Sequence, residues 1–159
     1  MSLEPDRLRA TGTQFGAEPQ PYRADYELTT IEGWVTERLE VVVHDGDGER
    51  RLDLRRSAEG GWTANGAPLP DLGGALDCDL AFSPVTNTMP ILRDGRGSRD
   101  YEMAWVSLPD LSVRLSRQRY EPIDERTIRY VSLDGDFSAE LELDLDGLVA
   151  RYPRMAERV

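Results

Sequence analysis

The sequence predicts a mainly β fold, an antiparallel sheet curled into a barrel or half-barrel and accompanied by one short helix. Short apolar alternations recur along the chain, separated by turn signals rich in glycine and aspartate. Such regularly spaced strands are typical of sandwiches and barrels. No internal repeat or linker interrupts the 159 residues, so we expect a single domain over 1–159. Residues 1–9 carry charge without periodicity, and we expect them to be flexible.

The first half of the chain alternates between apolar and polar residues as strands do. Aromatic and β-branched residues predict a strand over 22–30, and Val41 and Val43 mark the apolar face of the next one. A hairpin turn signal then runs from Asp45 to Gly48. The strands predicted in this half cover residues 22–30, 35–43, 51–54 and 76–80.

One helix is predicted in the middle of the chain, and strands resume after it. Ser83 suits the N-cap position and Pro84 the first helical position. Pro90 should end this helix early, because proline removes a backbone donor and clashes with the preceding turn. We therefore expect a short or irregular helix. The later strands are predicted at residues 101–107, 111–120, 127–133, 137–145 and 148–152.

The most regular alternation of the chain lies near its end. Phe137, Leu141, Leu143 and Leu145 fall at every second position, with acidic residues between them. Because successive side chains of a strand point to opposite faces, these four are expected to face the core. The intervening carboxylates should face solvent or a polar groove.

Charge and composition exclude several classes of function. The chain has 30 acidic and 19 basic residues, a net charge of −11 that disfavours nucleic acid and anionic membranes. Every basic residue is arginine, so neither a P-loop lysine nor a Schiff-base lysine exists. One histidine and one cysteine exclude multi-histidine metal sites and intrachain disulfides. We expect no cofactor and no metal.

Hydropathy and acidity suggest the setting of the protein. Apolar runs are too short for a transmembrane helix or a signal peptide, so a cytoplasmic location is expected. An acidic surface rich in arginine is typical of proteins from salt-adapted organisms, and we hypothesise a halophilic source. Ordinary replacement of lysine by arginine in a GC-rich genome is the alternative.

Several carboxylates are spaced so that they could act in pairs. Asp77 and Asp79 lie two apart on a predicted strand, and Asp144 and Asp146 repeat the arrangement. Neighbouring carboxylates can raise one another's pKa and serve as acid and base. In so acidic a chain, a solvated polar strand face is the favoured interpretation.

The single histidine and the single cysteine carry weaker signals. No nucleophile motif accompanies His44, which should be exposed beside a hairpin turn. Cys78 alternates with the two aspartates, so it should point to the apolar face as inert packing.

Residues 82–93 form the segment richest in candidate site residues. Ser83, Thr86, Asn87 and Thr88 lie between two prolines and beside apolar residues. These side chains could satisfy backbone groups at the ends of a helix. They could equally form the polar rim of an apolar pocket suited to sugar hydroxyls or a lipid head group. The residues alone leave both interpretations open.

A second cluster combines arginines with tyrosines on two neighbouring predicted strands. It consists of Arg117, Gln118, Arg119 and Tyr120, followed by Arg126, Arg129 and Tyr130. Guanidinium and phenol groups on one sheet face could bind an anionic head group. The favoured alternative is that the arginines neutralise the many nearby carboxylates.

Residues 77–93, which read DCDLAFSPVTNTMPILR, resemble the signature of the bacterial and archaeal family of putative glycolipid-binding proteins, long described as a domain of unknown function. The resemblance continues through Leu108-Pro-Asp-Leu111, Arg117-Gln-Arg-Tyr120 and Tyr152-Pro153. The family tends to have Ile-Arg-Arg-Leu where this chain has Ile91-Leu92-Arg93-Asp94, so only Arg93 carries over.

The resemblance implies a spiral β-roll, a curled antiparallel sheet wrapped around one short helix and distantly like the lipoprotein carriers. It also implies a homodimer and non-enzymatic binding of an amphipathic ligand, for example a glycolipid. Alternatives are a small carboxylate-based hydrolase or isomerase, or a dimer module without a ligand. The expected ligand-binding residues are Thr86, Asn87, Thr88, Arg93, Gln118, Tyr120 and Tyr130.

Overall fold

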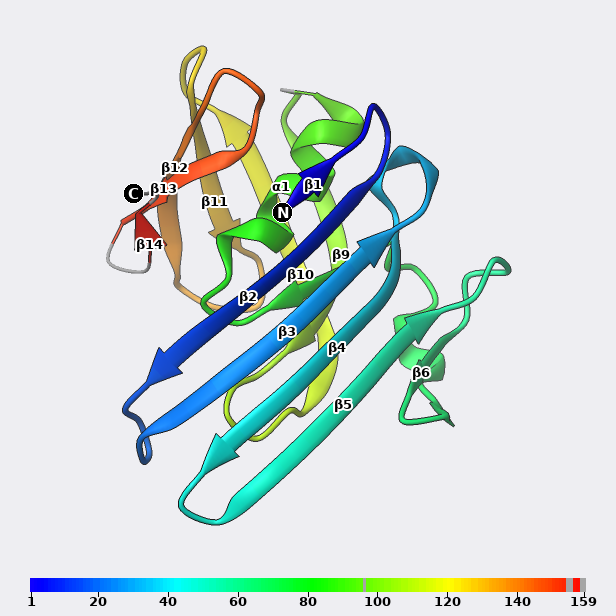
Figure 1. Ribbon diagram of the computed structural model, residues 1–159. Helices are drawn as coiled ribbons and strands as arrows, with labels where there is room; N and C mark the ends of the chain where they lie inside the picture. The colour runs from blue at the N-terminus through cyan, green and yellow to red at the C-terminus, as the bar shows by residue number, and fades with distance from the viewer. Residues whose placement is uncertain (96, 154–155, 158–159) are drawn as a thin grey trace.

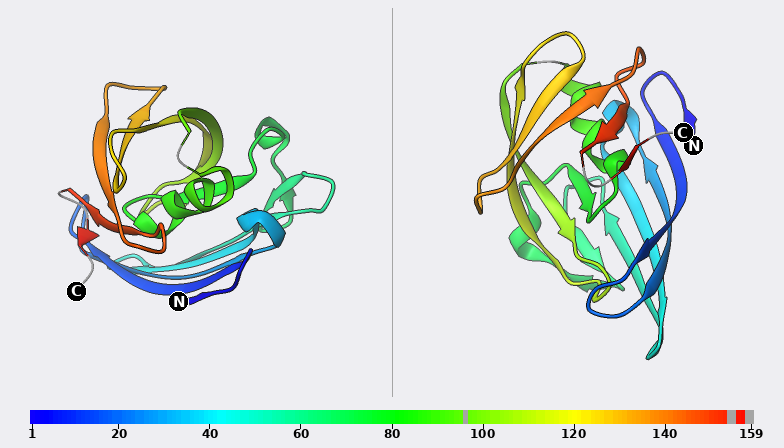
Figure 2. Two further views of the ribbon diagram at one scale, coloured as in Figure 1. Left: turned by 90° about the horizontal axis from the view of Figure 1, so that it is seen from above. Right: turned by 90° about the vertical axis from the view of Figure 1, so that its left-hand side faces the viewer.

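The computed structural model describes residues 1–159 except 96, 154, 155, 158 and 159. Among the described residues, the strands form two seven-stranded sheets, and helix α1 (Pro84–Asp94) lies between them (Figures 1 and 2). This arrangement confirms the predicted mainly β fold with a curled sheet and one helix.

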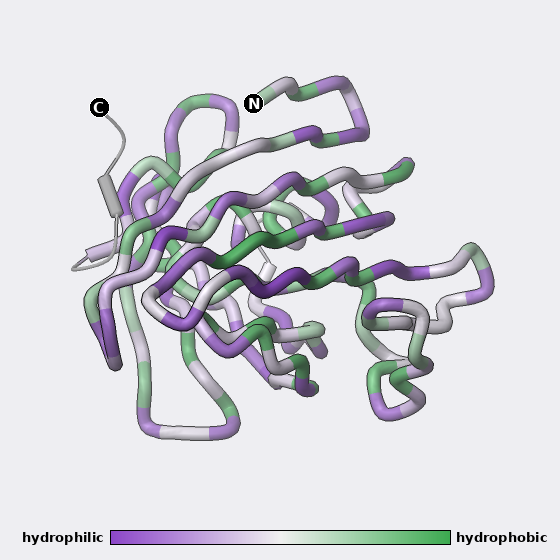
Figure 3. Tube along the Cα trace, turned by 60° about the horizontal axis from the view of Figure 1, so that its bottom comes forward, coloured by the Kyte–Doolittle hydropathy of each residue, from purple (hydrophilic) through white to green (hydrophobic). Residues whose placement is uncertain are grey.

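The first sheet is an antiparallel meander in which each strand pairs with the next along the chain. It contains β1 (Ser2–Leu3), β2 (Leu8–Gly16), β3 (Tyr22–Thr30), β4 (Thr36–Asp45), β5 (Gly48–Arg56), β6 (Trp62–Ala64) and β7 (Ala67–Pro68). A short 3₁₀ turn, η1 (Glu32–Trp34), joins β3 to β4. Hydrophobic and hydrophilic residues follow one another along its long strands (Figure 3), so one face packs on the core and the other meets solvent.

The second sheet curls around the helix, as the view from above shows (Figure 2). It contains β8 (Asp77–Leu80), β9 (Arg99–Val106), β10 (Val113–Pro122), β11 (Thr127–Ser132), β12 (Ser138–Leu143), β13 (Val149–Tyr152) and β14 (Ala156–Glu157). A second 3₁₀ turn, η2 (Pro70–Leu72), precedes it.

One strand pair departs from the predicted antiparallel pattern. Strand β8 pairs with β9 in parallel, with Asp79 opposite Trp105. Parallel neighbours need a crossover connection, and helix α1 supplies it. The helix therefore leaves one edge of the second sheet and lies across the inner face, where its side chains reach both sheets.

The helix is longer than Pro90 led us to expect. It continues through Pro90 to Asp94 and ends at Gly95, whose φ of 70° suits glycine and whose N–H donates to the Ile91 carbonyl at 3.0 Å. Met89 packs in the larger core cluster, which contains residues of both sheets, and Ile91 packs in a smaller cluster built from strands of the second sheet. Burial on both sides holds the helix where proline alone would break it.

The expected N-cap at Ser83 is correct in position but not in bonding. Ser83 precedes the first turn, yet its hydroxyl makes no capping hydrogen bond. Instead, the Thr86 hydroxyl donates to the Ser83 carbonyl at 2.9 Å.

Of the four core residues predicted from the last alternation, two are buried and two are exposed. Leu141 and Leu143 are buried, whereas Phe137 is 47% exposed and Leu145 is 90% exposed. The reason is that β12 covers only Ser138–Leu143, so both exposed residues lie beyond its ends, where the alternation no longer decides facing.

The start of the chain holds two strands that the sequence pattern does not predict. Strand β1 pairs with β2, and β2 runs along the whole of β3. Glycines at 12 and 16 weaken the strand signal of β2, but Gly12 lies opposite Tyr26 and Gly16 opposite Tyr22. Each tyrosine ring occupies the space that a Cβ on the facing glycine would need. These aromatic rings cover the edge glycines and stabilise the strand.

Candidate functional site

The candidate site lies where β8 ends and α1 begins, between the inner faces of the two sheets. Both aspartates of β8 are buried, with Asp77 1% and Asp79 7% exposed. The interpretation of this pair as a solvated polar strand face is therefore wrong. The alternation of the aspartates with Cys78 suggested one polar and one apolar face, but all four residues of β8 are buried. The first sheet covers β8 on one side, and α1 and the neighbouring strand β9 cover it elsewhere.

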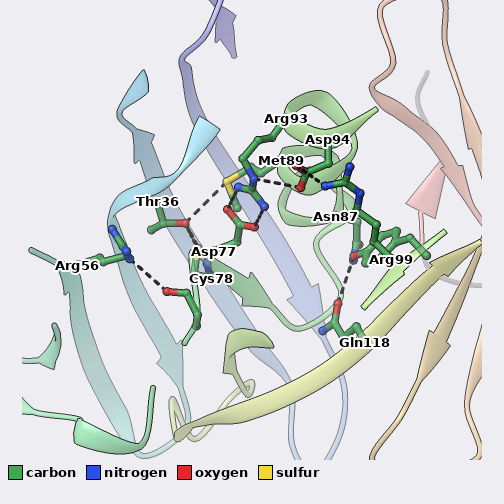
Figure 4. Close-up of polar contacts among 12 residues, drawn as sticks. Thr36, Arg56, Asp77, Cys78, Asn87, Met89, Arg93, Asp94, Arg99 and Gln118 are labelled. Atoms are coloured by element: carbon green, nitrogen blue, oxygen red, sulfur yellow. Dashed lines mark hydrogen bonds and ion pairs between the residues drawn. The ribbon is translucent and has the colours of Figure 1, made fainter. Parts of the chain in front are cut away.

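Asp77 is held by an arginine from the end of the helix. The Arg93 guanidinium donates to both oxygens of Asp77, at 2.8 and 2.7 Å, and also contacts Asp94 at 3.2 Å. Burial raises the pKa of the Asp77 carboxyl, and the Arg93 guanidinium works against that rise. The side chain of Arg93 is 13% exposed. Its charge is thus directed at Asp77 (Figure 4), away from any approaching head group.

Asp79 lies in a different environment, and none of its hydrogen-bond partners in the described chain is a cation. Its Oδ1 accepts from the Thr86 hydroxyl at 2.9 Å, and its Oδ2 accepts from the Gln118 amide at 2.5 Å. Burial raises the pKa of Asp79 to about 6, although both hydrogen bonds oppose this rise. A carboxyl with this pKa gains or loses its proton near neutral pH.

The hydrogen-bond network continues behind Asp79. The Tyr120 hydroxyl donates to Gln118 Oε1 at 3.2 Å and accepts from the Asn87 amide at 2.9 Å. In Figure 4, Asn87 and Gln118 lie apart from the pair of Arg93 and Asp77. Gln118 is fully buried and Tyr120 is 2% exposed. Gln118 thereby orients the Asp79 carboxyl, and Tyr120 orients Gln118 and the Asn87 amide.

A small pocket of about 180 Å³ opens onto Asp79. Asn87, Tyr130 and Tyr152 line it together with Asp79. The two tyrosines are 8% and 4% exposed, yet neither hydroxyl makes a hydrogen bond within the described chain. Burial first, and then the charge of Asp79, raises the pKa of both phenols, so they stay protonated at neutral pH. The apolar part of the lining includes Leu80, Phe82, Trp105 and Phe137.

A larger groove of about 680 Å³ lies beside this pocket. Its lining includes Phe15, Tyr22 and Tyr26 from the first sheet, with Pro84 and Pro153 opposite. The Oε1 atom of Gln14 also lies in this lining, buried and without a hydrogen-bond partner in the described chain. This volume falls within the range of roughly 300–1,000 Å³ typical of small-molecule sites.

Phe82 and Ser83 line both cavities. Phe82 is 55% exposed and has a φ of 61°, a left-handed conformation that is costly for a bulky residue. The hydrogen bonds of its neighbours, Ala81 N–H to the Val106 carbonyl and Ser83 N–H to the Leu80 carbonyl, hold it there. Strain of this kind tends to persist at functional sites.

The predicted site residues thus fall into four groups. Asn87 and Tyr130 line the pocket, while Thr86, Gln118 and Tyr120 support it from behind. Thr88 bridges to the backbone, donating to the Pro84 carbonyl and accepting from Val149 N–H at 3.3 Å. Arg93 forms an ion pair with Asp77, as described above. Asp79, Phe82, Trp105 and Tyr152 complete the site without having been predicted to bind ligand, because only the folded sheets bring them together.

Of the four arginines of the second cluster, three do not share a face with its tyrosines, and the fourth, Arg126, precedes β11 and donates to the Leu143 carbonyl at 3.1 Å. Strands β10 and β11 do pair, with Tyr120 opposite Tyr130. Alternation then places Arg117, Arg119 and Arg129 on the other face, because they sit at the intervening positions. There they pair with carboxylates: Arg117 with Asp134 at 2.9 Å, Arg119 with Asp100 at 2.5 Å, and Arg129 with Glu140 at 3.6 Å. The guanidinium groups neutralise carboxylates, as the favoured alternative held.

The remaining candidates have structural positions. His44 is exposed on the outer face of β4, between Asp25 and Glu49. Cys78 is fully buried, and burial raises the pKa of its thiol to about 12. Asp144 accepts hydrogen bonds from the backbone N–H groups of Asp146 and Leu148, both at 2.9 Å, and so shapes the turn before β13.

Two features are absent from the described residues. No cluster of three or more histidine, cysteine or acidic side chains has the geometry to hold a metal ion there. Within the same part of the chain, no helix has the length and hydropathy needed to cross a membrane.

Comparison with known proteins identifies relatives by sequence and by fold. A solved DUF1089 family protein from Pseudomonas aeruginosa is 32% identical, with a TM-score of 0.86 over 99% of this chain and 89% of that one. No curated protein matches the chain. The family model described as "Putative glycolipid-binding" matches residues 1–158, nearly the full length. The chain therefore belongs to the putative glycolipid-binding family.

Proposed function

We propose that this protein binds an amphipathic ligand, with the polar end in the Asp79 pocket and the apolar part along the neighbouring groove. The observation that carries the proposal is the junction of two cavities that share Phe82 and Ser83 as a common wall. The smaller one offers Asp79 and two tyrosine hydroxyls that have no partner within the described chain, and the larger one offers aromatic rings and prolines beside polar side chains such as Thr13 and Glu18. The family description points to the same class of ligand.

The groove supplies the affinity and the pocket the orientation. Burying one methylene contributes about 0.8 kcal/mol, so two extra carbons on a tail should strengthen binding about tenfold while the groove is still being filled. Beyond its length, further carbons should add nothing, because they extend into solvent. The tail length at which the affinity stops rising would measure the length of the groove.

A chain-length series of alkyl glucosides tests the proposal by titration calorimetry below the micelle concentration. Phe15→Ser should weaken the long-tailed ligands and leave the shortest unchanged, because Phe15 lines only the groove. Leu145→Ser is the matched control, since Leu145 is 90% exposed and lies outside both cavities. An affinity that does not depend on tail length would contradict the proposal.

Catalysis is a second candidate function, favoured by one observation. A buried carboxyl with a pKa of about 6 could exchange a proton with a ligand. Paired-carboxylate hydrolysis is less well supported, because Asp77 is bound to Arg93 and does not line the pocket. Incubation with the bound glucoside, followed by mass spectrometry, separates binding from turnover.

We also propose a homodimer, as the family resemblance implied. The edges of the two sheets are formed by β1, β7, β8 and β14, and unpaired edges favour association with a second chain. Light scattering in molar salt tests the proposal, and a monomeric mass would contradict it.

A further inference from the structure

We infer that the polar end of the ligand is a single uncharged sugar ring, and that the Asp79 pocket rejects anionic head groups. This inference rests on the proposed function and names the chemistry of its ligand. It replaces the anionic head group that the arginine cluster suggested.

The size of the pocket sets the size of the head group. A volume of about 180 Å³ lies well below the range of roughly 300–1,000 Å³ typical of small-molecule sites, so the pocket suits a small head group. One hexose ring fills such a space, whereas a disaccharide exceeds it. A second ring would have to displace Phe82 or remain outside.

The hydrogen-bonding groups in the pocket match hydroxyls better than any acceptor-only group. The hydroxyls of Tyr130 and Tyr152 can each donate and accept, and neither has a partner within the described chain. Asn87 donates to Tyr120 and has its carbonyl oxygen left as an acceptor. Asp79 accepts two hydrogen bonds and has lone pairs for more. Phosphate or sulfate oxygens could use only the donors, leaving the acceptors of Asn87 and Asp79 facing other acceptors.

The charges around the pocket oppose an anion. None of the described residues that line it is basic. Arg93 is bound to Asp77, and Arg117, Arg119 and Arg129 pair with carboxylates on the opposite face of the sheet. Arg114 lies over the ring of Trp105, 4.5 Å from its centroid, and does not line the pocket. Among the described lining residues, the one charged group is Asp79. The lining also contains the rings of Phe82, Trp105 and Phe137, which suit the apolar faces of a pyranose.

Five probes separate the parts of this inference: octyl glucoside, octyl maltoside, octyl phosphate, octanol and methyl glucoside. We expect octyl glucoside to bind at least tenfold more tightly than octyl phosphate or octyl maltoside. Comparison with octanol isolates the head group, and comparison with methyl glucoside isolates the tail. Calorimetry on the full chain, at fixed salt and neutral pH, gives all five dissociation constants.

Removal of the two phenol hydroxyls provides the matched test on the protein. The double variant Tyr130→Phe with Tyr152→Phe should weaken octyl glucoside binding about tenfold. Binding of octanol and the melting temperature should not change, because neither hydroxyl has a partner among the residues that the structure describes. Tyr101→Phe, which removes a hydroxyl from a residue outside both cavities, should leave all five affinities unchanged.

The outcomes distinguish this inference from the proposed function. Octyl phosphate or octyl maltoside binding as tightly as octyl glucoside, or a double variant with unchanged affinity, overturns the sugar-ring inference alone. Octanol binding as tightly as octyl glucoside does the same. Methyl glucoside binding as tightly as octyl glucoside refutes the groove and thus the proposed function. If no probe binds, both are refuted.

Discussion

Replacing Asp79 with asparagine should make the protein more stable at neutral pH and leave its stability at acidic pH almost unaffected. Asp79 is 7% exposed, and burial raises its pKa from 3.8 to about 6. In the unfolded chain the same carboxyl ionises near its ordinary value of about 3.9. Each pKa unit is worth about 1.4 kcal/mol, so the difference between the two states corresponds to about 3 kcal/mol.

The sign follows from which state holds the proton. Between the two pKa values, unfolded Asp79 has lost its proton while folded Asp79 keeps it. Its contribution to stability is therefore fully present below about pH 4 and is lost as the pH rises through about 6. Asparagine cannot ionise, so the variant does not suffer this loss.

Urea unfolding of both proteins at about pH 4, 5, 6 and 7.5, at constant salt, measures the effect. The change in unfolding free energy on substitution should be more favourable at the highest pH than at the lowest by about 3 kcal/mol. Any constant effect of altered hydrogen bonds cancels in that difference. Asp136→Asn, at an exposed position, is the control. If Asp79→Asn and wild type stay parallel across the whole range, the assignment of a raised pKa to Asp79 is refuted.

Four further outcomes are expected. Leu143→Ala should lower the unfolding free energy by roughly 2–5 kcal/mol, whereas Leu145→Ala should cost less than about 0.5 kcal/mol; equal costs would mean that the facing of β12 is wrong. Arg93→Met should cost about 3–5 kcal/mol by leaving Asp77 unpaired, and adding Asp77→Leu should recover most of this loss in a double-mutant cycle. Phe82→Gly should change stability by less than about 1 kcal/mol, because relief at a positive φ offsets glycine's entropy, yet it should weaken octyl glucoside binding in calorimetry. The melting temperature should rise with KCl up to molar concentration if the acidic surface is a salt adaptation, and no gain would reject that hypothesis.

The strands could be predicted wherever alternation and turn chemistry agree. The predicted strand over 22–30 matches β3 at both ends, and the turn signal at 45–48 joins β4 to β5 as expected. Strand β2 escaped prediction because Gly12 and Gly16 lack side chains, and the rings that cover them come from the neighbouring strand. A single-strand pattern does not contain that information.

The helix shows how tertiary packing overrides a local signal. Pro90 is a strong stop signal in sequence, yet the helix extends four residues further, to Asp94. Ile91 lies beyond Pro90 and is buried against the second sheet, so ending the helix at Pro90 would expose it. Burying side chains of this size contributes about 1.5–3 kcal/mol each, which is comparable to the cost of about 3 kcal/mol for an internal proline.

The candidate site was only partly predictable, because its parts come from distant segments. The polar residues of 82–93 were recognisable by their types, but their directions were not. Asn87 faces the pocket, whereas Thr86 and Thr88, one position away on either side, hydrogen-bond within the scaffold. Tyr152 reaches the pocket from β13, more than sixty residues after Asn87, and no spacing rule connects the two.

At Asp79, the side chain that folding would favour differs from the one that binding would require. An apolar residue at this position would avoid the cost of a desolvated carboxyl, and 30 acidic residues already give the chain its solubility. Thr86 and Gln118 are arranged to hold both oxygens of this one acid, and Tyr120 in turn holds Gln118. Such a network orients the carboxyl toward the pocket and favours its ionised form. Because folding alone would favour a neutral side chain here, the retained acid is best explained by what it contacts in the pocket. Asp79→Asn should therefore gain stability at neutral pH and lose affinity for octyl glucoside, and a variant whose affinity is unchanged or higher would show that the carboxyl does not serve binding.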